Sequence, residues 1–187
     1  MKIVNLLKPW VLFFYFKQFL LLLKHRGRLS LGSYRFSYEK LVEIKIDASS
    51  KINLGKISHL CKGVNVEAHD KATISIGDYF FMNKNSSLIA RYGITIGNNC
   101  MIGEHTTISD HNHKFESSNI DYGIQGYTGA QITIGNNVWI AGRVFIGQGV
   151  HIGDNVVIGA NTIVTKSIPS NSVVYGKTEL VIKKKND

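Results

Sequence analysis

Residues 132–167 read ITIGNN-VWIAGR-VFIGQG-VHIGDN-VVIGAN-TIVTKS, six units of six residues in unbroken succession. Each unit has an aliphatic residue at its third position, and glycine follows it in four of the six units. A helix repeats every 3.6 residues and a half-buried strand alternates every two, so a period of six fits neither. It predicts a parallel β-solenoid, in which short strands stack their aliphatic side chains inside and the small residues lie at the corners.

The same period extends towards the N-terminus. One register, with Ser58 and Asp70 as its weaker members, is shared by Ile46, Ile52, Val64, Ile76, Met82, Leu88 and Ile94. Near Arg91 the register shifts by two positions, and it continues through Ile96, Ile102 and Ile108. The solenoid is therefore expected to occupy most of the chain.

Residues 109–131 interrupt the hexads, which predicts a loop extruded from the solenoid. We expect three segments. An apolar and basic N-terminal segment (1–43) precedes the solenoid (44–176), and a basic tail (177–187) follows it.

Charge is distributed unevenly along the 187 residues. Residues 1–40 hold eight Lys or Arg and one acidic residue, whereas residues 41–176 hold ten of each. The neutral body argues against nucleic-acid binding, which needs a patterned basic surface. The two cysteines, Cys61 and Cys100, are far apart in sequence and predict reduced thiols in a cytoplasmic protein.

The hexads resemble those of the left-handed parallel β-helix acyltransferases. Residues 132–176 are similar to the maltose/galactoside O-acetyltransferase branch of that family. The resemblance implies a left-handed prism with three hexads per coil. It also implies a homotrimer that binds acetyl-CoA between subunits and requires no metal.

Two histidines, His111 and His113, lie in the segment ISDHNHKFE (108–116), where the expected loop begins. Acetyl transfer to a hydroxyl needs a general base, and neutral imidazole is available at physiological pH. The resemblance places the catalytic histidine at His113. His111 is the second candidate, and we also expect it to contact the acceptor.

The resemblance assigns further acceptor contacts to Asn83, Arg91 and Trp139. An amide such as that of Asn83 both donates to and accepts from a hydroxyl. Arg91 stands where the family has an acidic ligand, and the family's N-terminal acceptor-binding segment is missing. Both departures argue against a free maltose-type acceptor, and an arginine is suited to a carboxylate or phosphate.

The resemblance also assigns the residues that bind acetyl-CoA, the donor of the acetyl group. The backbone N–H of Gly142 is expected to polarise the thioester carbonyl, as an oxyanion-hole donor does. Ala160, Thr165 and Lys166 are expected to contact CoA, and Lys183 stands where the family has a CoA-binding arginine. Leu180 replaces a second such arginine.

The N-terminal segment carries two apolar runs separated by Lys17-Gln18, each too short to span a bilayer. Pro9 is suited to the first turn of a helix over residues 10–24. Such a helix can cover the open end of the solenoid or a neighbouring subunit. It can also lie in a membrane interface, so we expect peripheral membrane contact through residues 1–28.

Together these features predict a cytoplasmic, acetyl-CoA-dependent O-acetyltransferase, located on the inner face of the cytoplasmic membrane. Its acceptor is expected to be a sugar hydroxyl of a bacterial surface polysaccharide or a lipid-linked precursor. Three alternatives stay open. One is an antibiotic acetyltransferase of the chloramphenicol or streptogramin kind, and another is a non-catalytic trimeric scaffold. The third is a metal enzyme similar to the γ-class carbonic anhydrases, with His105, His111 and His113 as ligands, although their spacing fits that site poorly.

Overall fold

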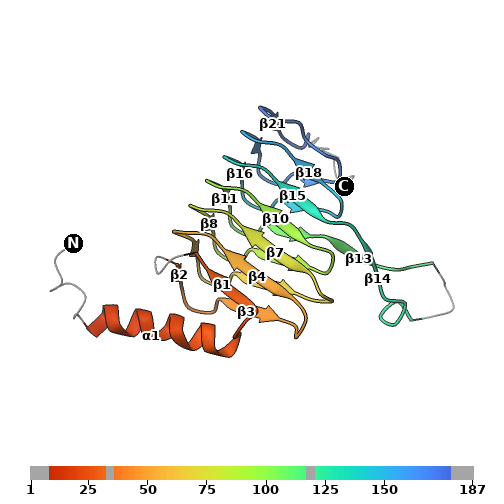
Figure 1. Ribbon diagram of the computed structural model, residues 1–187. Coiled ribbons are helices and arrows are strands. Elements are labelled where there is room, and N and C mark those ends of the chain that lie inside the picture. Colours follow the sequence, from red (N-terminus) through yellow and green to blue (C-terminus); the bar gives the residue numbers. More distant parts are fainter. Residues whose placement is uncertain (1–8, 33–35, 117–120, 178–187) are drawn as a thin grey trace, which may run out of the picture.

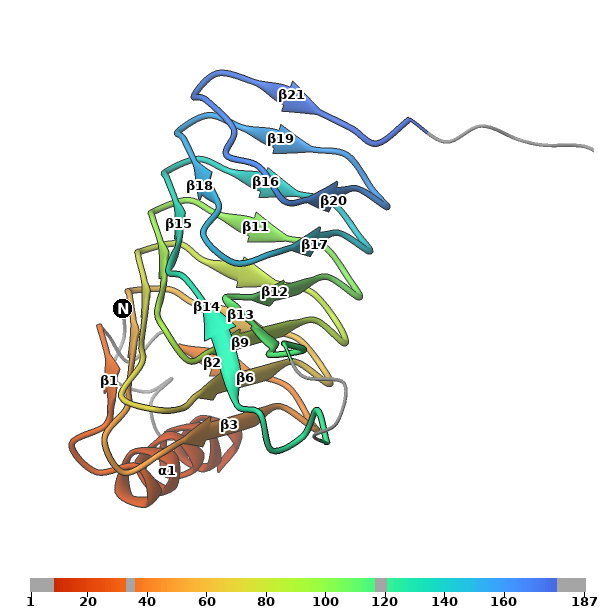
Figure 2. The same ribbon diagram turned by 90° about the vertical axis from the view of Figure 1, so that its right-hand side faces the viewer.

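The computed structural model describes residues 9–32, 36–116 and 121–177. They form a parallel β-solenoid of three sheets, with one helix at its N-terminal end and one hairpin projecting from its side (Figures 1 and 2). The predicted solenoid and its interruption are confirmed.

The three sheets are named A, B and C in the order in which the chain visits them. Sheet A contains β1 (Leu29–Leu31), β4 (Lys51–Leu54), β7 (Thr73–Ile76), β10 (Ile94–Ile96), β15 (Ile132–Ile134) and β18 (His151–Ile152). Sheet B contains β2 (Ser37–Tyr38), β5 (His59–Leu60), β8 (Phe81–Met82), β11 (Met101–Ile102), β16 (Trp139–Ile140), β19 (Val157–Ile158) and β21 (Val173–Val174). Sheet C contains β3 (Glu43–Ile46), β6 (Asn65–Ala68), β9 (Ser87–Ala90), β12 (Thr107–Ser109), β17 (Phe145–Ile146) and β20 (Ile163–Val164). The turns between them form three edges, which we call A/B, B/C and C/A.

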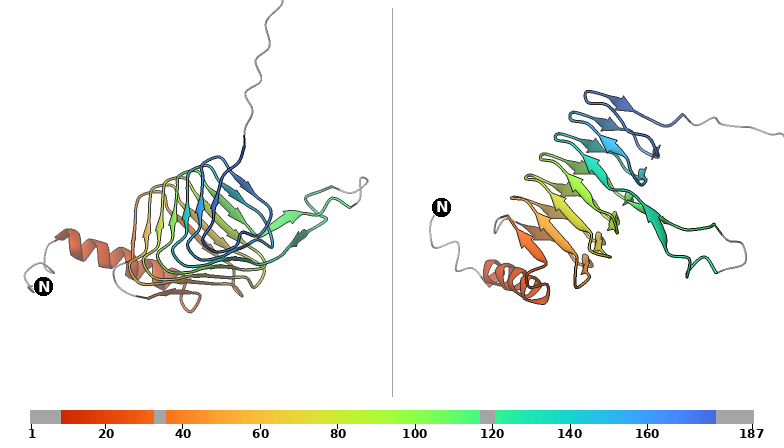
Figure 3. Two further views of the ribbon diagram at one scale, coloured as in Figure 1. Left: turned by 90° about the horizontal axis from the view of Figure 1, so that it is seen from above. Right: turned by 45° about the vertical axis from the view of Figure 1, so that its right-hand side comes forward.

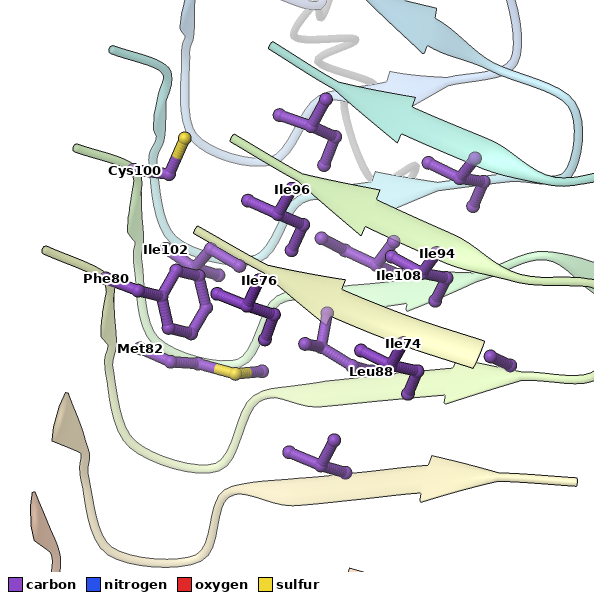
Figure 4. Packing of buried hydrophobic residues seen from close by; sticks show 14 of the residues in the cluster. Ile74, Ile76, Phe80, Met82, Leu88, Ile94, Ile96, Cys100, Ile102 and Ile108 are labelled. Atoms are coloured by element: carbon purple, nitrogen blue, oxygen red, sulfur yellow. The ribbon is translucent and has the colours of Figure 1, made fainter. Parts of the chain in front are cut away.

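The core runs along the axis of the solenoid as columns of aliphatic side chains. Ile94 pairs with Ile74 on one side and with Ile132 on the other, and all three are fully buried. Figure 4 shows the labelled part of these columns, with Ile74 and Ile76 next to Ile94 and Ile96. Equivalent aliphatic side chains in successive coils stack on one another and are removed from water. This burial of apolar surface is the main contribution to the stability of the fold.

The register predicted for the early coils is partly wrong. With three hexads per coil, Ile52 is expected to stack on Asp70, but it pairs with Ile74, and Leu54 pairs with Ile76. Asp70 is exposed and lies at the C/A edge, although Ser58 is buried as expected. Both Asp70 and its neighbour Lys71 have positive φ. The extra residues in this turn lengthen the early coils. A strict six-residue period therefore assigns the wrong partners there.

The small residues lie at the corners, as predicted, but their role is close packing between coils. A Cβ on Gly97 would lie 2.6 Å from the carbonyl oxygen of Gly135 in the next coil. The left-handed backbone of the A/B turns falls instead on asparagines such as Asn99 and Asn137, with φ of 56° and 55°. Asparagine tolerates that conformation better than most residues. Its side chain also bridges coils, since Asn137 Nδ2 donates to Asn155 Oδ1 at 2.9 Å.

Helix α1 (Pro9–Lys24) confirms the helix expected after Pro9. Leu21 and Leu22 pack against the core, and the buried Gln18 donates a hydrogen bond from Nε2 to the Phe36 carbonyl. The helix therefore covers the N-terminal end of the solenoid. In the part of the chain that the structure describes, no helix combines the length and apolar character needed to cross a bilayer.

Candidate functional site

The predicted extruded loop contains a two-stranded hairpin, which we call the arm. Strands β13 (His111–His113) and β14 (Tyr127–Gly129) pair antiparallel, with His111 opposite Gly129 and His113 opposite Tyr127. The arm leaves the C/A edge between β12 and β15, on the side of the solenoid opposite α1 (Figure 3). Both candidate histidines therefore lie on one strand at its root.

Asp110 fixes the base of the arm. Its side chain is fully buried, and its carboxylate accepts hydrogen bonds from three consecutive backbone N–H groups. The shortest bonds join Arg91 N to Oδ1 at 2.9 Å, Tyr92 N to Oδ2 at 2.8 Å and Gly93 N to Oδ2 at 2.6 Å. Hydrogen bonds to a carboxylate are stronger than those between neutral groups. Asp110 thus ties the start of the arm to the turn before β10.

The two histidines have different surroundings. Nδ1 of His111 lies 3.0 Å from Oδ1 of Asp110, and a carboxylate can only accept, so Nδ1 carries the proton. Nε2 of His111 is then free to accept a hydrogen bond. His113 is exposed, and its ring lies tilted against Tyr127 with 4.6 Å between the centroids. Tyr127 also contacts the edge of His111, so it positions both rings.

Arg91 lies on the same edge but is already engaged. Its Nη1 forms an ion pair with Asp70, and its guanidinium stacks 3.6 Å from the centroid of the Tyr127 ring. These residues line a hollow of about 420 Å³ beneath the arm, together with Lys71, Ala72 and Tyr92. An anionic acceptor group at this point would have to compete with Asp70 for the arginine.

A second group of predicted residues lies on the B/C edge. Asn83, Trp139 and Gly142 line a common hollow of about 310 Å³ with Phe81, Met101 and Glu104. Trp139 is 49% exposed and pairs in register with Met101, so it projects outward from sheet B. Asn83 Nδ2 donates to Glu104 Oε2 at 3.3 Å. No acceptor for the Gly142 N–H occurs among the described residues, and an unpaired donor is what an oxyanion hole requires.

The residues that are expected to contact CoA lie on two different edges. Ala160 is exposed on the B/C edge. Thr165 and Lys166 are exposed on the C/A edge, where they line a hollow of about 420 Å³ with Ile163 and Pro169. Lys183 lies outside the described residues.

Within one chain, the predicted residues thus form two groups on separate edges of the prism. The C/A edge has the histidines, Arg91, Thr165 and Lys166, and the B/C edge has Asn83, Gly142 and Ala160. His105 lies in a turn of the B/C edge, so the three-histidine alternative has its ligands on different edges.

Sequence reasoning missed Asp110, Tyr127 and Glu104. Asp110 could have been noticed as an acidic residue directly before His111. Tyr127 lies within the interruption of the hexads, where no repeat predicts which residues face one another.

Residues 131–166 match the family described as "Bacterial transferase hexapeptide (six repeats)". These residues are similar to the repeat of the bacterial hexapeptide transferases. This match confirms the resemblance expected from the hexads, and acyltransferase is the enzyme class that the comparisons support.

Three solved structures illustrate the resemblance. A maltose O-acetyltransferase from Clostridium difficile 630 is 27% identical, with a TM-score of 0.55 over 92% of this chain and 77% of that one. AntD, an N-acyltransferase from Bacillus cereus solved with dTDP and 3-hydroxybutyryl-CoA, is 20% identical, with a TM-score of 0.67 over 82% and 81%. The hexapeptide-repeat acetyltransferase VCA0836 from Vibrio cholerae, complexed with acetyl-CoA, is 21% identical, with a TM-score of 0.53 over 87% and 73%. The last two share the fold.

Proposed function

We propose that the protein is an acetyl-CoA-dependent O-acetyltransferase that acts on a sugar hydroxyl of a bacterial surface polysaccharide or its lipid-linked precursor. The observation that carries this proposal is the pair of histidines at the root of an arm that leaves a hexapeptide solenoid. The similarity to a maltose O-acetyltransferase and the CoA bound to related folds support the same chemistry.

The proposed reaction is direct transfer. His113 accepts the proton of the sugar hydroxyl while the hydroxyl oxygen attacks the thioester carbonyl. The Gly142 N–H stabilises the negative charge that develops on the carbonyl oxygen. The C–S bond then breaks, the acetyl group stays on the sugar as an ester, and the proton passes from His113 to the CoA sulfur.

The remaining site residues position the two substrates. We assign acceptor contacts to Asn83, Arg91, Trp139 and His111. His111 is suited to this role because Asp110 fixes its tautomer and leaves Nε2 as an acceptor for a hydroxyl. The assigned CoA contacts are Gly142, Ala160, Thr165, Lys166 and Lys183, of which the lysines would meet phosphate groups as point charges.

A homotrimer completes the proposed site. The base and the oxyanion donor lie on different edges, so the C/A edge of one copy must meet the B/C edge of the next. Cyclic assemblies form such heterologous contacts as they close into a ring. Acetyl-CoA would bind in the cleft between adjacent copies.

We further propose that residues 1–28 hold the enzyme on the inner face of the cytoplasmic membrane. Helix α1 leaves one face uncovered by the solenoid, with Phe13, Phe16 and Phe19 each more than half exposed. Lys24 and Arg26 lie exposed at the C-terminal end of this face. Apolar rings next to basic side chains are typical of helices that bind anionic bilayers.

The experiment that tests the reaction compares CoA release by three purified alanine variants. His113→Ala should reduce turnover about 10²–10⁴-fold, the usual contribution of a general base. His111→Ala should mainly raise the KM for the acceptor. His105→Ala, which removes an exposed imidazole from the B/C edge, serves as the control and should keep its activity. Undiminished turnover by His113→Ala would contradict the assignment of the base.

A further inference from the structure

Three side chains with metal-binding atoms converge near the N-terminal end of the solenoid. Glu39 follows β2, His59 begins β5, and Cys61 directly follows that strand. Strands β2 and β5 run parallel with Ser37 opposite His59, which brings Glu39 next to Cys61. One ligand atom from each of the three residues lies within 4.8 Å of the others. The cluster is separate from the histidines of the arm.

His59 is held in a defined orientation. Its Nδ1 shares a hydrogen bond with the Ser37 hydroxyl, and its ring stacks on Phe81 with centroids 5.6 Å apart and an interplanar angle of 17°. Its Nε2 therefore points to the cluster, 3.6 Å from Oε1 of Glu39. Histidines that bind metals with one ring nitrogen commonly have a hydrogen-bond partner on the other.

We propose that Glu39, His59 and Cys61 bind a zinc ion. Thiolate, imidazole and carboxylate are the ligands that zinc takes from proteins, and three of them leave a fourth position for water. Ligand atoms around tetrahedral zinc lie roughly 3.3–3.8 Å apart, so the cluster needs only a small contraction. Glu39 can supply it by a small rotation of its exposed side chain, at the expense of the hydrogen bond that its Oε2 accepts from the Lys62 N–H at 3.0 Å, whereas Cys61 is buried.

Zinc binding requires the Cys61 thiol to lose its proton. Burial and the neighbouring Glu39 raise the pKa of the Cys61 thiol, while Lys84 acts in the opposite direction. The thiol therefore carries its proton at neutral pH without a metal. Zinc would displace that proton, and its affinity would increase with pH.

The ion would join the terminal coil to the second coil. Strand β2 is the edge strand of sheet B, and it pairs only with β5 within that sheet. A metal bridge from Glu39 to His59 and Cys61 crosses this pairing and would fasten the edge strand. This role is structural, so acyl transfer itself would still need no metal, and the inference does not depend on the proposed function.

The test uses Co²⁺ as a spectroscopic probe for zinc in metal-free, tag-free, full-length protein. The wild type should bind one Co²⁺ per chain with a thiolate charge-transfer absorption that Zn²⁺ abolishes. Cys61→Ser should lose this absorption. Cys100→Ser, which removes the other buried thiol, should retain it. Absence of a thiolate band in the wild type, or its persistence in Cys61→Ser, would overturn the proposal.

Two further variants distinguish the loss of zinc binding from misfolding of Cys61→Ser. Glu39→Gln changes an exposed side chain and should weaken Zn²⁺ binding at least tenfold, with an unchanged circular dichroism spectrum. Ser37→Ala removes only the partner of His59 and should weaken binding about 10–100-fold. Zn²⁺ should also raise the melting temperature of the wild type and of Cys100→Ser, but not that of Cys61→Ser. Equal Zn²⁺ affinity in Glu39→Gln and the wild type would count against the cluster.

Discussion

Asp110 is completely buried, and among the described residues no lysine or arginine side chain pairs with its carboxylate. Burying such a group is costly unless hydrogen bonds replace its water shell. Here the backbone donors of residues 91–93 and the ring of His111 replace it. The same bonds set the direction in which the arm leaves the solenoid. Stability and the position of the proposed site therefore depend on one residue.

Asp110→Asn should destabilise the protein by about 2–4 kcal/mol, because the new amide directs its own N–H groups at buried donors. It should also lower turnover, since His111 loses the partner that fixes its tautomer. Denaturant unfolding and steady-state kinetics measure the two effects. Asp70→Asn, at an exposed ion pair with Arg91, is the matched control and should cost about 0–1 kcal/mol. Equal stability of the two variants would show that Asp110 does not have this role.

At the scale of elements, α1 and the arm are the two parts that depart from the repeat. The arm carries polar and aromatic side chains towards the proposed site. Helix α1 buries one face on the end of the solenoid and exposes Leu12, Phe13, Phe16, Phe19, Leu20 and Leu23 on the other. A contiguous apolar surface of this kind marks an interaction site.

Replacing Phe13, Phe16 and Phe19 together with serine should reduce binding to anionic vesicles at least tenfold, because each buried ring contributes about 1.5–3 kcal/mol. Co-sedimentation with vesicles of anionic and of neutral lipid measures the binding and its dependence on charge. Phe115→Ser removes a 76% exposed ring from the arm and should leave binding unchanged. If the triple variant still binds as the wild type does, or if the wild type does not bind, α1 is not a membrane anchor.

At the scale of the whole molecule, the separation of the two edges is the dominant feature. Asn83 lies on the B/C edge of the hydrogen-bonded coils, and His113 lies on the arm that leaves the C/A edge, so the two residues are on separate edges of one chain. The site that we propose would therefore need two copies, each providing one edge. This arrangement allows two inactive chains to restore one another.

Co-expressing His113→Ala with Asn83→Ala should restore activity that neither variant has alone. In a mixed trimer, one of the three sites would combine an intact Asn83 with an intact His113. Random mixing then gives about a quarter of wild-type turnover. CoA release by the co-purified complex measures this, and sedimentation gives its mass. No recovery in a confirmed mixed trimer would place the whole site within a single chain.

The fold was largely predictable because every unit of residues 132–167 repeats the same local pattern, and stacked units bury the same positions. The partners within the early coils were not, because these coils contain more than three hexads: β6 and β7 have four residues each, and the left-handed pair Asp70-Lys71 lies in the turn between them.

The candidate site was only partly predictable for a related reason. His111 and His113 are neighbours in sequence, but Asp110 meets Arg91 only after the coils have stacked. Tyr127 meets both histidines only after β13 and β14 have paired in the arm. The approach of Glu39 to Cys61 likewise needs the pairing of β2 with β5. Contacts of this kind depend on the number of residues in a coil, which the hexads alone do not determine.

The register of the C-terminal coils also restricts how the chain can change in length. Ile134 pairs with Ile152, Ile140 with Ile158 and Ile146 with Val164. Excising residues 135–152 would join Ile134 to Gly153, and each inward position downstream would meet an equivalent one. Removing a piece that is not a multiple of six residues would turn polar side chains into the axis, and removing one or two hexads would leave an incomplete coil. The solenoid can therefore change in length only by whole coils. Duplication or loss of whole coils is neutral to packing, and gradual insertion is confined to the corners and the arm.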